Sequence, residues 1–269
     1  MDESFKHILI PFDNSESARV ALRTAVNLAQ VFDARLTLVV VNADDDMERK
    51  AKKIIEKIHR RTNKEVLYLR PSGRVFVEVV DAAKAVGADL IIMGTHGTNG
   101  VQDFFIGSNA YRVVSTSPIP VMTMRDSFEK NKFDRIVIPM DDSSESRQKM
   151  PMVKQVANYF NSKVYVLATS KWDDADVRKR VIRYSEQAVE MLEENEIEAE
   201  MSSAFGGNIA NSTMDYADEV KADLIIAMSE TEPSAGFFMG ANAQRLVNRC
   251  EVPVLTVHAK QVVIGVPGY

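Results

Sequence analysis

The residues of this chain that could do chemistry gather in one short stretch of its N-terminal half. An apolar run ends in Gly94-Thr95-His96-Gly97, nine residues follow, and Gly107-Ser108 opens a helical pattern. Glycines let the chain turn tightly and bring backbone N–H groups close to a ligand. A Gly-Ser pair at a helix start adds N–H groups and a hydroxyl where the helix dipole favours negative charge. The stretch predicts a cradle for an anion such as a phosphate chain.

Four blocks of the sequence occur twice, in the same order, which shows that the chain contains an internal repeat. The blocks are HILIPFDNSES and RIVIPMDDSSES, ADLII in both copies, FFIGSNA and FFMGANA, and PVMTM and PVLTV. The offset between the copies drifts only between about 128 and 134 residues, and a polar stretch at 125–132 separates them. We expect one domain at 1–127, a diverged copy at 133–260, and a tail at 261–269 that we do not assign.

Each copy alternates short apolar runs with amphipathic stretches. In the first copy the predicted strands are 8–12, 36–41, 66–69, 90–93 and 121–124, and the helices start near residue 14 and span 47–62, 75–86 and 108–115. Continuous apolar strands separated by helices predict a parallel sheet covered on both faces. The fold class is therefore α/β, with two tandem doubly wound five-stranded domains. Such sheets bind ligands beyond the carboxyl ends of the strands, where the strand order reverses.

Composition excludes several other classes of protein. The chain has 269 residues, of which 45% are apolar and 26% charged, as in ordinary globular proteins. Its formal charge of −5 gives no reason to expect nucleic acid or an anionic membrane as partner. The apolar runs are strand-sized, and the first residues do not resemble a signal peptide. With a single cysteine, Cys250, we expect a cytoplasmic protein without a disulfide.

The glycine motif resembles the ATP-binding signature of the universal stress protein family. The opening strand ending in Pro11-Phe12-Asp13-Asn14-Ser15, the ADLIIMG block and the closing Pro-Val strand are also similar to that family. The resemblance covers nearly the whole chain as a tandem pair. It implies an adenine nucleotide α-hydrolase-like fold in each half. It further implies that the closing strands, 121–124 and 254–257, pair within one chain into a pseudo-dimer, with a homodimer left open.

The same resemblance implies which residues bind the nucleotide. They are Pro11, Asp13, Val41, Met93, Gly94, Gly97, Gly107, Ser108 and Asn109. Asp13 would meet the ribose side of ATP or its metal, Pro11 would shape that turn, and Val41 would line the adenine pocket. Residues 93–94 would lie under the ribose, and the residues from Gly97 onward would hold the phosphates. Mg²⁺ would relieve the crowding of phosphate charges, although no protein metal cluster is expected. Asp13 could instead simply cap the first helix.

The second copy departs from the binding pattern. Depending on where a one-residue gap falls, Gly94 matches Ala227 or Met228, and neither alignment leaves a glycine at the position of Gly97. The Gly-Ser pair becomes Gly240-Ala241, which loses the hydroxyl, and two loop glutamates add negative charge. We expect this copy to be a structural or regulatory partner that does not bind ATP through this loop.

Three functions compete at this point. The first is a stress-response module whose shape or partners change when ATP binds. The second is a slow ATPase or autophosphorylating enzyme, disfavoured because no Lys or Arg stands between Gly94 and Gly107, although Arg112 is not excluded. The third is a scaffold that binds no nucleotide and acts through subunit contacts. Trp172 is expected to pack at the domain interface rather than on an adenine, and Cys250 to be half-buried.

Overall fold

The computed structural model describes residues 5–95, 107–128, 130, 132–143, 145–229 and 239–259. The strands are β1 His7–Pro11, β2 Arg35–Val39, β3 Val66–Leu69, β4 Leu90–Gly94, β5 Val121–Met124, β6 Arg135–Met140, β7 Lys163–Ser170, β8 Ala199–Phe205, β9 Leu224–Ser229 and β10 Val254–His258. The helices are α1 Glu16–Val31, α2 Asp45–Thr62, α3 Val75–Val86, α4 Ser108–Thr116, α5 Met150–Phe160, α6 Ala175–Glu193, α7 Ile209–Glu219 and α8 Ala241–Arg249, with a 3₁₀ helix η1 at Glu145–Lys149.

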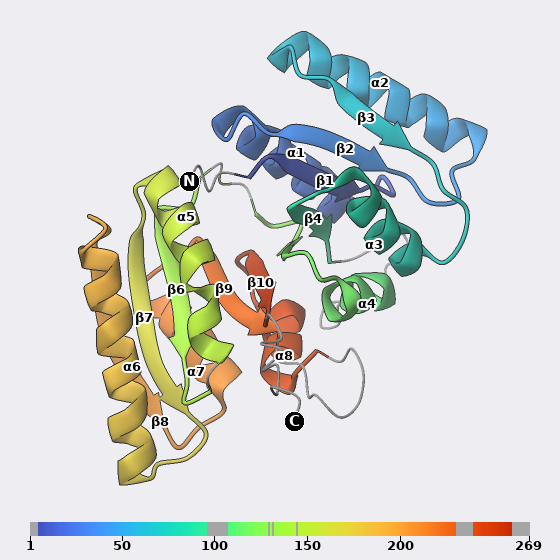
Figure 1. The fold of residues 1–269 in the computed structure, drawn as a ribbon. Coiled ribbons are helices and arrows are strands. Elements are labelled where there is room, and N and C mark those ends of the chain that lie inside the picture. The colour runs from blue at the N-terminus through green and yellow to red at the C-terminus, as the bar shows by residue number, and fades with distance from the viewer. Residues whose placement is uncertain are drawn as a thin grey trace, which may run out of the picture.

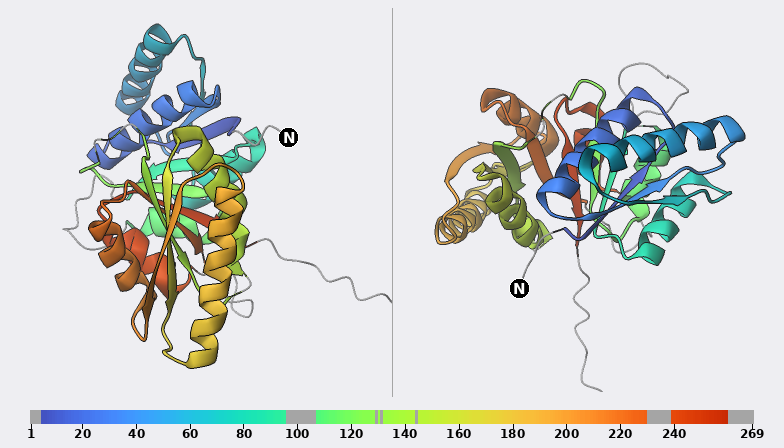
Figure 2. Two further views of the ribbon diagram at one scale, coloured as in Figure 1. Left: turned by 90° about the vertical axis from the view of Figure 1, so that its left-hand side faces the viewer. Right: turned by 90° about the horizontal axis from the view of Figure 1, so that it is seen from above.

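The ten strands form one sheet in the order β3-β2-β1-β4-β5-β10-β9-β6-β7-β8 (Figure 1). Within each half all neighbouring strands are parallel, whereas β5 and β10 pair antiparallel at the centre. The prediction of two doubly wound five-stranded halves paired through their closing strands is confirmed. Figure 2 shows the two halves on either side of this central pair.

The helices begin and end where local chemistry dictates. Ser15 caps α1 by accepting a hydrogen bond from the backbone N–H of Ala18, and Asp44 caps α2 in the same way through Met47. Gly87 ends α3 in the left-handed conformation, with φ of 64°, as its position in the sequence predicts. These caps fix where the chain passes from β1 into α1, from β2 into α2 and from α3 into β4.

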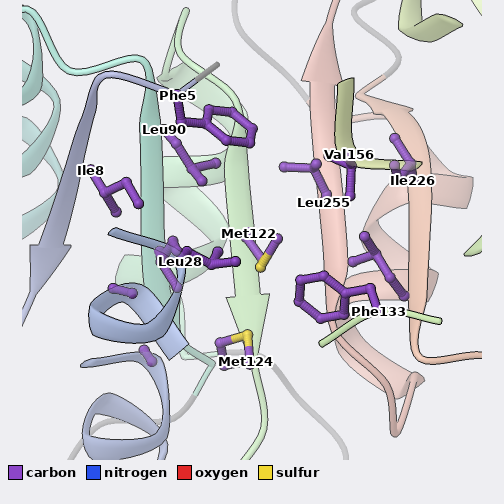
Figure 3. Packing of buried hydrophobic residues seen from close by; sticks show 14 of the residues in the cluster. Phe5, Ile8, Leu28, Leu90, Met122, Met124, Phe133, Val156, Ile226 and Leu255 are labelled. Carbon is purple, nitrogen blue, oxygen red and sulfur yellow. The ribbon is translucent and has the colours of Figure 1, made fainter. Parts of the chain in front are cut away.

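The two faces of the sheet carry separate cores. Helices α1, α2, α5 and α6 cover one face and α3, α4, α7 and α8 cover the other. The first core crosses the junction between the halves: Met122 of β5 is the register partner of Leu255 of β10, and both are fully buried beside Phe133 (Figure 3). Phe32 packs against Tyr159 with the ring centroids 3.7 Å apart and the ring planes tilted by 53°, which joins the end of α1 to the end of α5. The halves therefore share apolar core rather than merely touching.

The repeated ADLII block has a structural reason. Asp89 accepts hydrogen bonds from the backbone N–H groups of Lys6 and His7, at the start of β1. Its counterpart Asp223, which is buried, accepts from Asp134 N and Arg135 N at 3.0 Å and also pairs with the ammonium of Lys130. Each aspartate thus holds the entry of the neighbouring parallel strand, before β4 or β9 begins.

We expect Asp223→Ala to lower the free energy of unfolding by about 2 kcal/mol, because it leaves two backbone donors without their charged acceptor. Urea denaturation at pH 7 measures this value. Asp134→Ala, which removes an exposed carboxylate beside the same strand, is the control and should cost less than about 0.5 kcal/mol. Equal losses in the two variants would contradict the assigned role of Asp223.

Candidate functional site

The strand order reverses between β1 and β4. The chain passes from β1 to its neighbour β2 on one side, whereas β4 lies against β1 on the other side. Helices that cover opposite faces of the sheet separate at such a point and leave a crevice beyond the carboxyl ends of the strands. The predicted site residues that the structure describes lie at or just beyond the ends of β1, β2 and β4 and at the start of α4.

One hydrogen bond places the start of α4 directly beyond β4. Gly107 N donates to Thr95 O at 2.7 Å, so the two ends of the glycine loop meet. Thr95 is itself anchored, because its backbone N–H and hydroxyl both donate to Met124 O of β5. Residues 96–106, including Gly97, lie outside the described part of the chain.

The first turn of α4 is suited to hold an anion. Gly107 is the N-cap and supplies no side-chain hydrogen bond to the turn, while Ser108 and Asn109 are exposed. The first N–H groups of a helix have no intrahelical acceptor and lie at the positive end of the helix dipole. The structure thus places Gly107 at the cap and Ser108 and Asn109 in the first turn of this helix.

The ends of β1 and β2 supply the other side of the crevice. Pro11, the last residue of β1, is the register partner of Val39, the last residue of β2, so Asp13 and Val41 each follow their strand by two residues. Asp13 is exposed, and its Oδ1 accepts from Ser15 N at 3.0 Å and Ser15 Oγ at 2.6 Å. Ser15, rather than Asp13, caps α1. Asp13 therefore orients the capping serine and keeps its carboxylate at the edge of the sheet.

Val41 and Met93 lie on the same side of the sheet as α4. Met93 is buried in the core formed with α3 and α4, and Val41 packs against that core, which also contains Ala110 of α4. An apolar wall thus runs from β2 to β4 on the side of the sheet that α4 covers. Asn42 was not among the predicted site residues; its side-chain amide bonds both N and O of Gly73 at 2.9 Å and ties the end of β2 to the loop before α3. The signal in the sequence was an asparagine directly after a predicted strand, since Asn tolerates the left-handed conformation that Asn42 adopts, with φ of 55°.

Gly94 differs from Gly107, because the structure requires a glycine here for helix packing. A Cβ at this position would lie 2.4 Å from Ser17 Oγ and 2.7 Å from Ala18 N, closer than atoms can approach. The absent side chain lets the first turn of α1 pack directly on β4. Position 94 therefore faces α1, opposite to the α4 side.

The sheet register decides which residue replaces Gly94 in the second half. The equivalent register pairs are Ile8 with Leu90 and Ile136 with Leu224. Counting four residues on, Gly94 corresponds to Met228, which is buried. In this half the helix does not begin with an α-helical turn: η1 packs against β9, and α5 starts only at Met150, with Pro151 in its first turn. The glycine that admits the first turn of α1 is thus missing in the half whose helix starts late.

The second half also contains a buried cation. Lys149 lies at the position of Ala21, is 1% exposed, and its Nζ donates to Ser146 O at 2.5 Å and Ser146 Oγ at 3.1 Å. Burial lowers the pKa of Lys149 to about 8, against the opposing effect of the Asp141 carboxylate. The hydroxyl of Ser146 in turn accepts from Asp141 N at 3.1 Å. Ser146 thus connects the buried Lys149 to the turn after β6, and the first half has no lysine at this position.

We expect the contribution of Lys149 to the stability of the protein to rise with pH above about 8. A folded-state pKa below the ordinary value of 10.5 means that the unfolded chain binds the proton more strongly, so deprotonation favours folding. Relative to Lys149→Met, the wild type should gain on the order of 2 kcal/mol between pH 7.5 and pH 10. Urea denaturation of both proteins at each pH measures the difference. Tyr216 and Cys250, whose pKa values burial raises to about 12, titrate alike in both proteins and cancel. Parallel pH profiles would contradict the prediction.

Two expectations about single residues were wrong. Trp172 does not pack at the domain interface: it is 59% exposed, follows β7 and lies with Lys171 Nζ 5.1 Å from its ring centroid. Strand β7 is separated from the central β5–β10 pair by β6 and β9, so no side chain at its end reaches the junction. Cys250 is buried rather than half-buried, at 5% exposure.

Comparisons with known proteins agree with this architecture. The model of the universal stress protein family matches residues 4–70, 44–125 and 132–258. The chain belongs to the universal stress protein family. Its matched segments cover both halves, as expected of a tandem member. In the described residues no helix is long and apolar enough to cross a membrane, and no group of three or more His, Cys, Asp or Glu side chains could hold a metal ion.

Known family members resemble one half or the whole chain. A universal stress protein of Thermus aquaticus is 33% identical over 138 residues, which is 45% of this chain and 99% of that protein. One of Methanocaldococcus jannaschii is 29% identical over 144 residues, 45% of this chain and 82% of its own length. A universal stress protein structure from Archaeoglobus fulgidus has a TM-score of 0.74 at 20% identity and covers 94% of this chain and 98% of its own. At this identity the structural likeness establishes the two-half fold alone.

Proposed function

We propose that the first half of this universal stress protein binds ATP in the crevice between β1 and β4, and that occupancy changes the shape or partners of the tandem. The observation that carries the proposal is the first turn of α4. It has no side-chain cap and is held beyond the end of β4 by the bond from Gly107 to Thr95. Phosphates need hydrogen-bond donors, which the uncapped N–H groups and the exposed serine hydroxyl provide. The positive end of the helix dipole also favours their negative charge.

The remaining site residues have consistent parts in this proposal. Ser108 and Asn109, with Gly97 of the preceding loop, would hold the phosphates, while Val41 and Met93 would form the apolar wall against the base and ribose. Asp13 offers an exposed carboxylate at the same edge. Mg²⁺ in proteins is commonly held by one or two carboxylates together with substrate phosphates. The donor set thus fits a nucleotide that brings its magnesium ion.

The second half would act as a partner rather than a second ATP site. Met228 replaces Gly94, the helix after β6 starts late, and Ala241 takes the place of Ser108. The pairing of β5 with β10 gives this half direct contact with the strand that follows α4. We propose that it senses the occupancy of the first half through this contact, and that further pairing into a homodimer uses other surfaces.

Slow ATP hydrolysis or autophosphorylation is the alternative proposal. Efficient phosphoryl transfer needs cations that stabilise the developing charge. The sequence between Gly94 and Gly107 carries no Lys or Arg, which favours binding over turnover. Phosphate release by the purified chain at ordinary enzyme rates, about 1 s⁻¹ or faster, would replace the binding proposal with the enzymatic one.

We expect Ser108→Glu to weaken ATP binding at least about tenfold. A carboxylate in the first turn repels phosphates but stabilises the helix through its dipole, so the fold is retained. The repeat offers a matched control in Ala241→Glu, which introduces the same charge at the same exposed position of α8. Isothermal titration with Mg-ATP measures the affinities, and urea denaturation checks that both variants are folded.

The outcomes separate the candidate functions. Loss of binding in Ser108→Glu with wild-type affinity in Ala241→Glu supports an ATP site in the first half. The reverse pattern would place the nucleotide in the second half and defeat the proposal. A wild-type protein that fails to bind millimolar ATP, ADP or AMP leaves the scaffold function in its place.

A further inference from the structure

The side chain of Arg112 is held at the edge of the candidate site by an aromatic ring. Its guanidinium carbon lies 5.0 Å from the ring centroid of Phe76. Phe76 belongs to the first turn of α3, and α3 packs beside α4 (Figure 1). The contact is a cation–π pair, which restrains an otherwise mobile exposed side chain.

The position of Arg112 on α4 directs it toward the anion-binding turn. Arg112 follows Ser108 by four residues, so the two side chains lie on the same helix face. Side chains of an α-helix lean toward its N-terminus, which brings the guanidinium back over the first turn. The first turn of α3, where Phe76 lies, follows β3 and is therefore at the same edge of the sheet as the start of α4.

Nothing in the described residues neutralises this cation. No carboxylate there forms a salt bridge with Arg112, although α2 alone carries several such pairs. A guanidinium stacked on a ring keeps its N–H edge available, and this planar fork matches the oxygens of a phosphate. Because stacking has already restricted its rotamers, less conformational entropy is lost when it binds.

We propose that Arg112, positioned by Phe76, contacts the terminal phosphates and makes the site prefer nucleoside triphosphates over monophosphates. This inference rests on the proposed ATP site. It assigns to Arg112 the discrimination between nucleotides that carry different numbers of phosphates. The α4 amides bind any phosphate near the helix start. Arg112, one turn away along the exposed face, is placed to add affinity only for phosphates that extend beyond them.

The second half supplies the internal comparison. Arg245 occupies the position of Arg112 on α8, five residues after the equivalent cap Gly240. The position of Phe76 is Ala210, the second residue of α7, so this arginine has no equivalent ring. The aromatic restraint is therefore a property of the half that keeps the glycine loop.

The experiment compares the affinities of ATP, ADP and AMP at constant free Mg²⁺ and about 50 mM salt, where screening is moderate. Arg112→Met keeps an unbranched side chain without the charge and should weaken ATP binding about tenfold while changing AMP binding less than about twofold. Phe76→Leu should weaken ATP about threefold, because the guanidinium is present but unrestrained. Arg245→Met is the matched control and should leave all three affinities unchanged. The urea midpoint of each variant confirms folding.

The outcomes distinguish this inference from the proposed site itself. If wild type and Arg112→Met bind ATP equally, the role of Arg112 is refuted and the site stands. Equal losses for ATP and AMP also refute it, since the arginine would then act on the base, the ribose or the fold. An equal effect of Arg245→Met shows a general charge effect and refutes it as well. If the wild type binds none of the three nucleotides, the proposed function fails and this inference with it.

Discussion

The antiparallel pairing of β5 with β10 is the constraint on which the rest of the molecule depends. It turns two parallel sheets into one and buries Met122 against Leu255 at the junction. Because the pairing is antiparallel, the carboxyl ends of the two halves lie at opposite edges of the common sheet. The two potential ligand edges are thus kept apart, and any coupling between them passes through the strands and helices next to the junction.

The junction also ties each half to the last helix of the other. Arg125, directly after β5, donates from its guanidinium to Asn248 O near the end of α8. His258, at the end of β10, occupies the equivalent place beside the backbone of Val114 and Ser115 in α4. Burial lowers the pKa of His258, and its Nε2 shares a 2.9 Å hydrogen bond with Ser229 Oγ. The helix that carries the proposed phosphate turn is therefore held at its far end by the second half.

The two copies differ at a strand end where one glycine has been replaced. Gly94 permits the close approach of α1 to β4, whereas Met228 stands at the equivalent position and η1 takes the place of the first helical turn. Lys149 then lies buried beneath the turn, bonded to Ser146. The close contact between α1 and β4 needs a glycine, because the helix and strand backbones can meet only where no side chain intervenes.

The sequence by itself determined the local and repeated features of this protein. The two copies, the buried strands, the end of α3 at Gly87 and the Gly-Ser start of α4 follow from residue types and spacing, which report local backbone preference and burial. Tertiary structure alone decided that Gly94 corresponds to Met228, that Thr95 holds Gly107, that Arg112 stacks on Phe76 and that Trp172 is exposed. These facts depend on strand register and on which helices become neighbours. Both are set by packing between segments far apart in the chain, and periodicity within one segment carries no record of them.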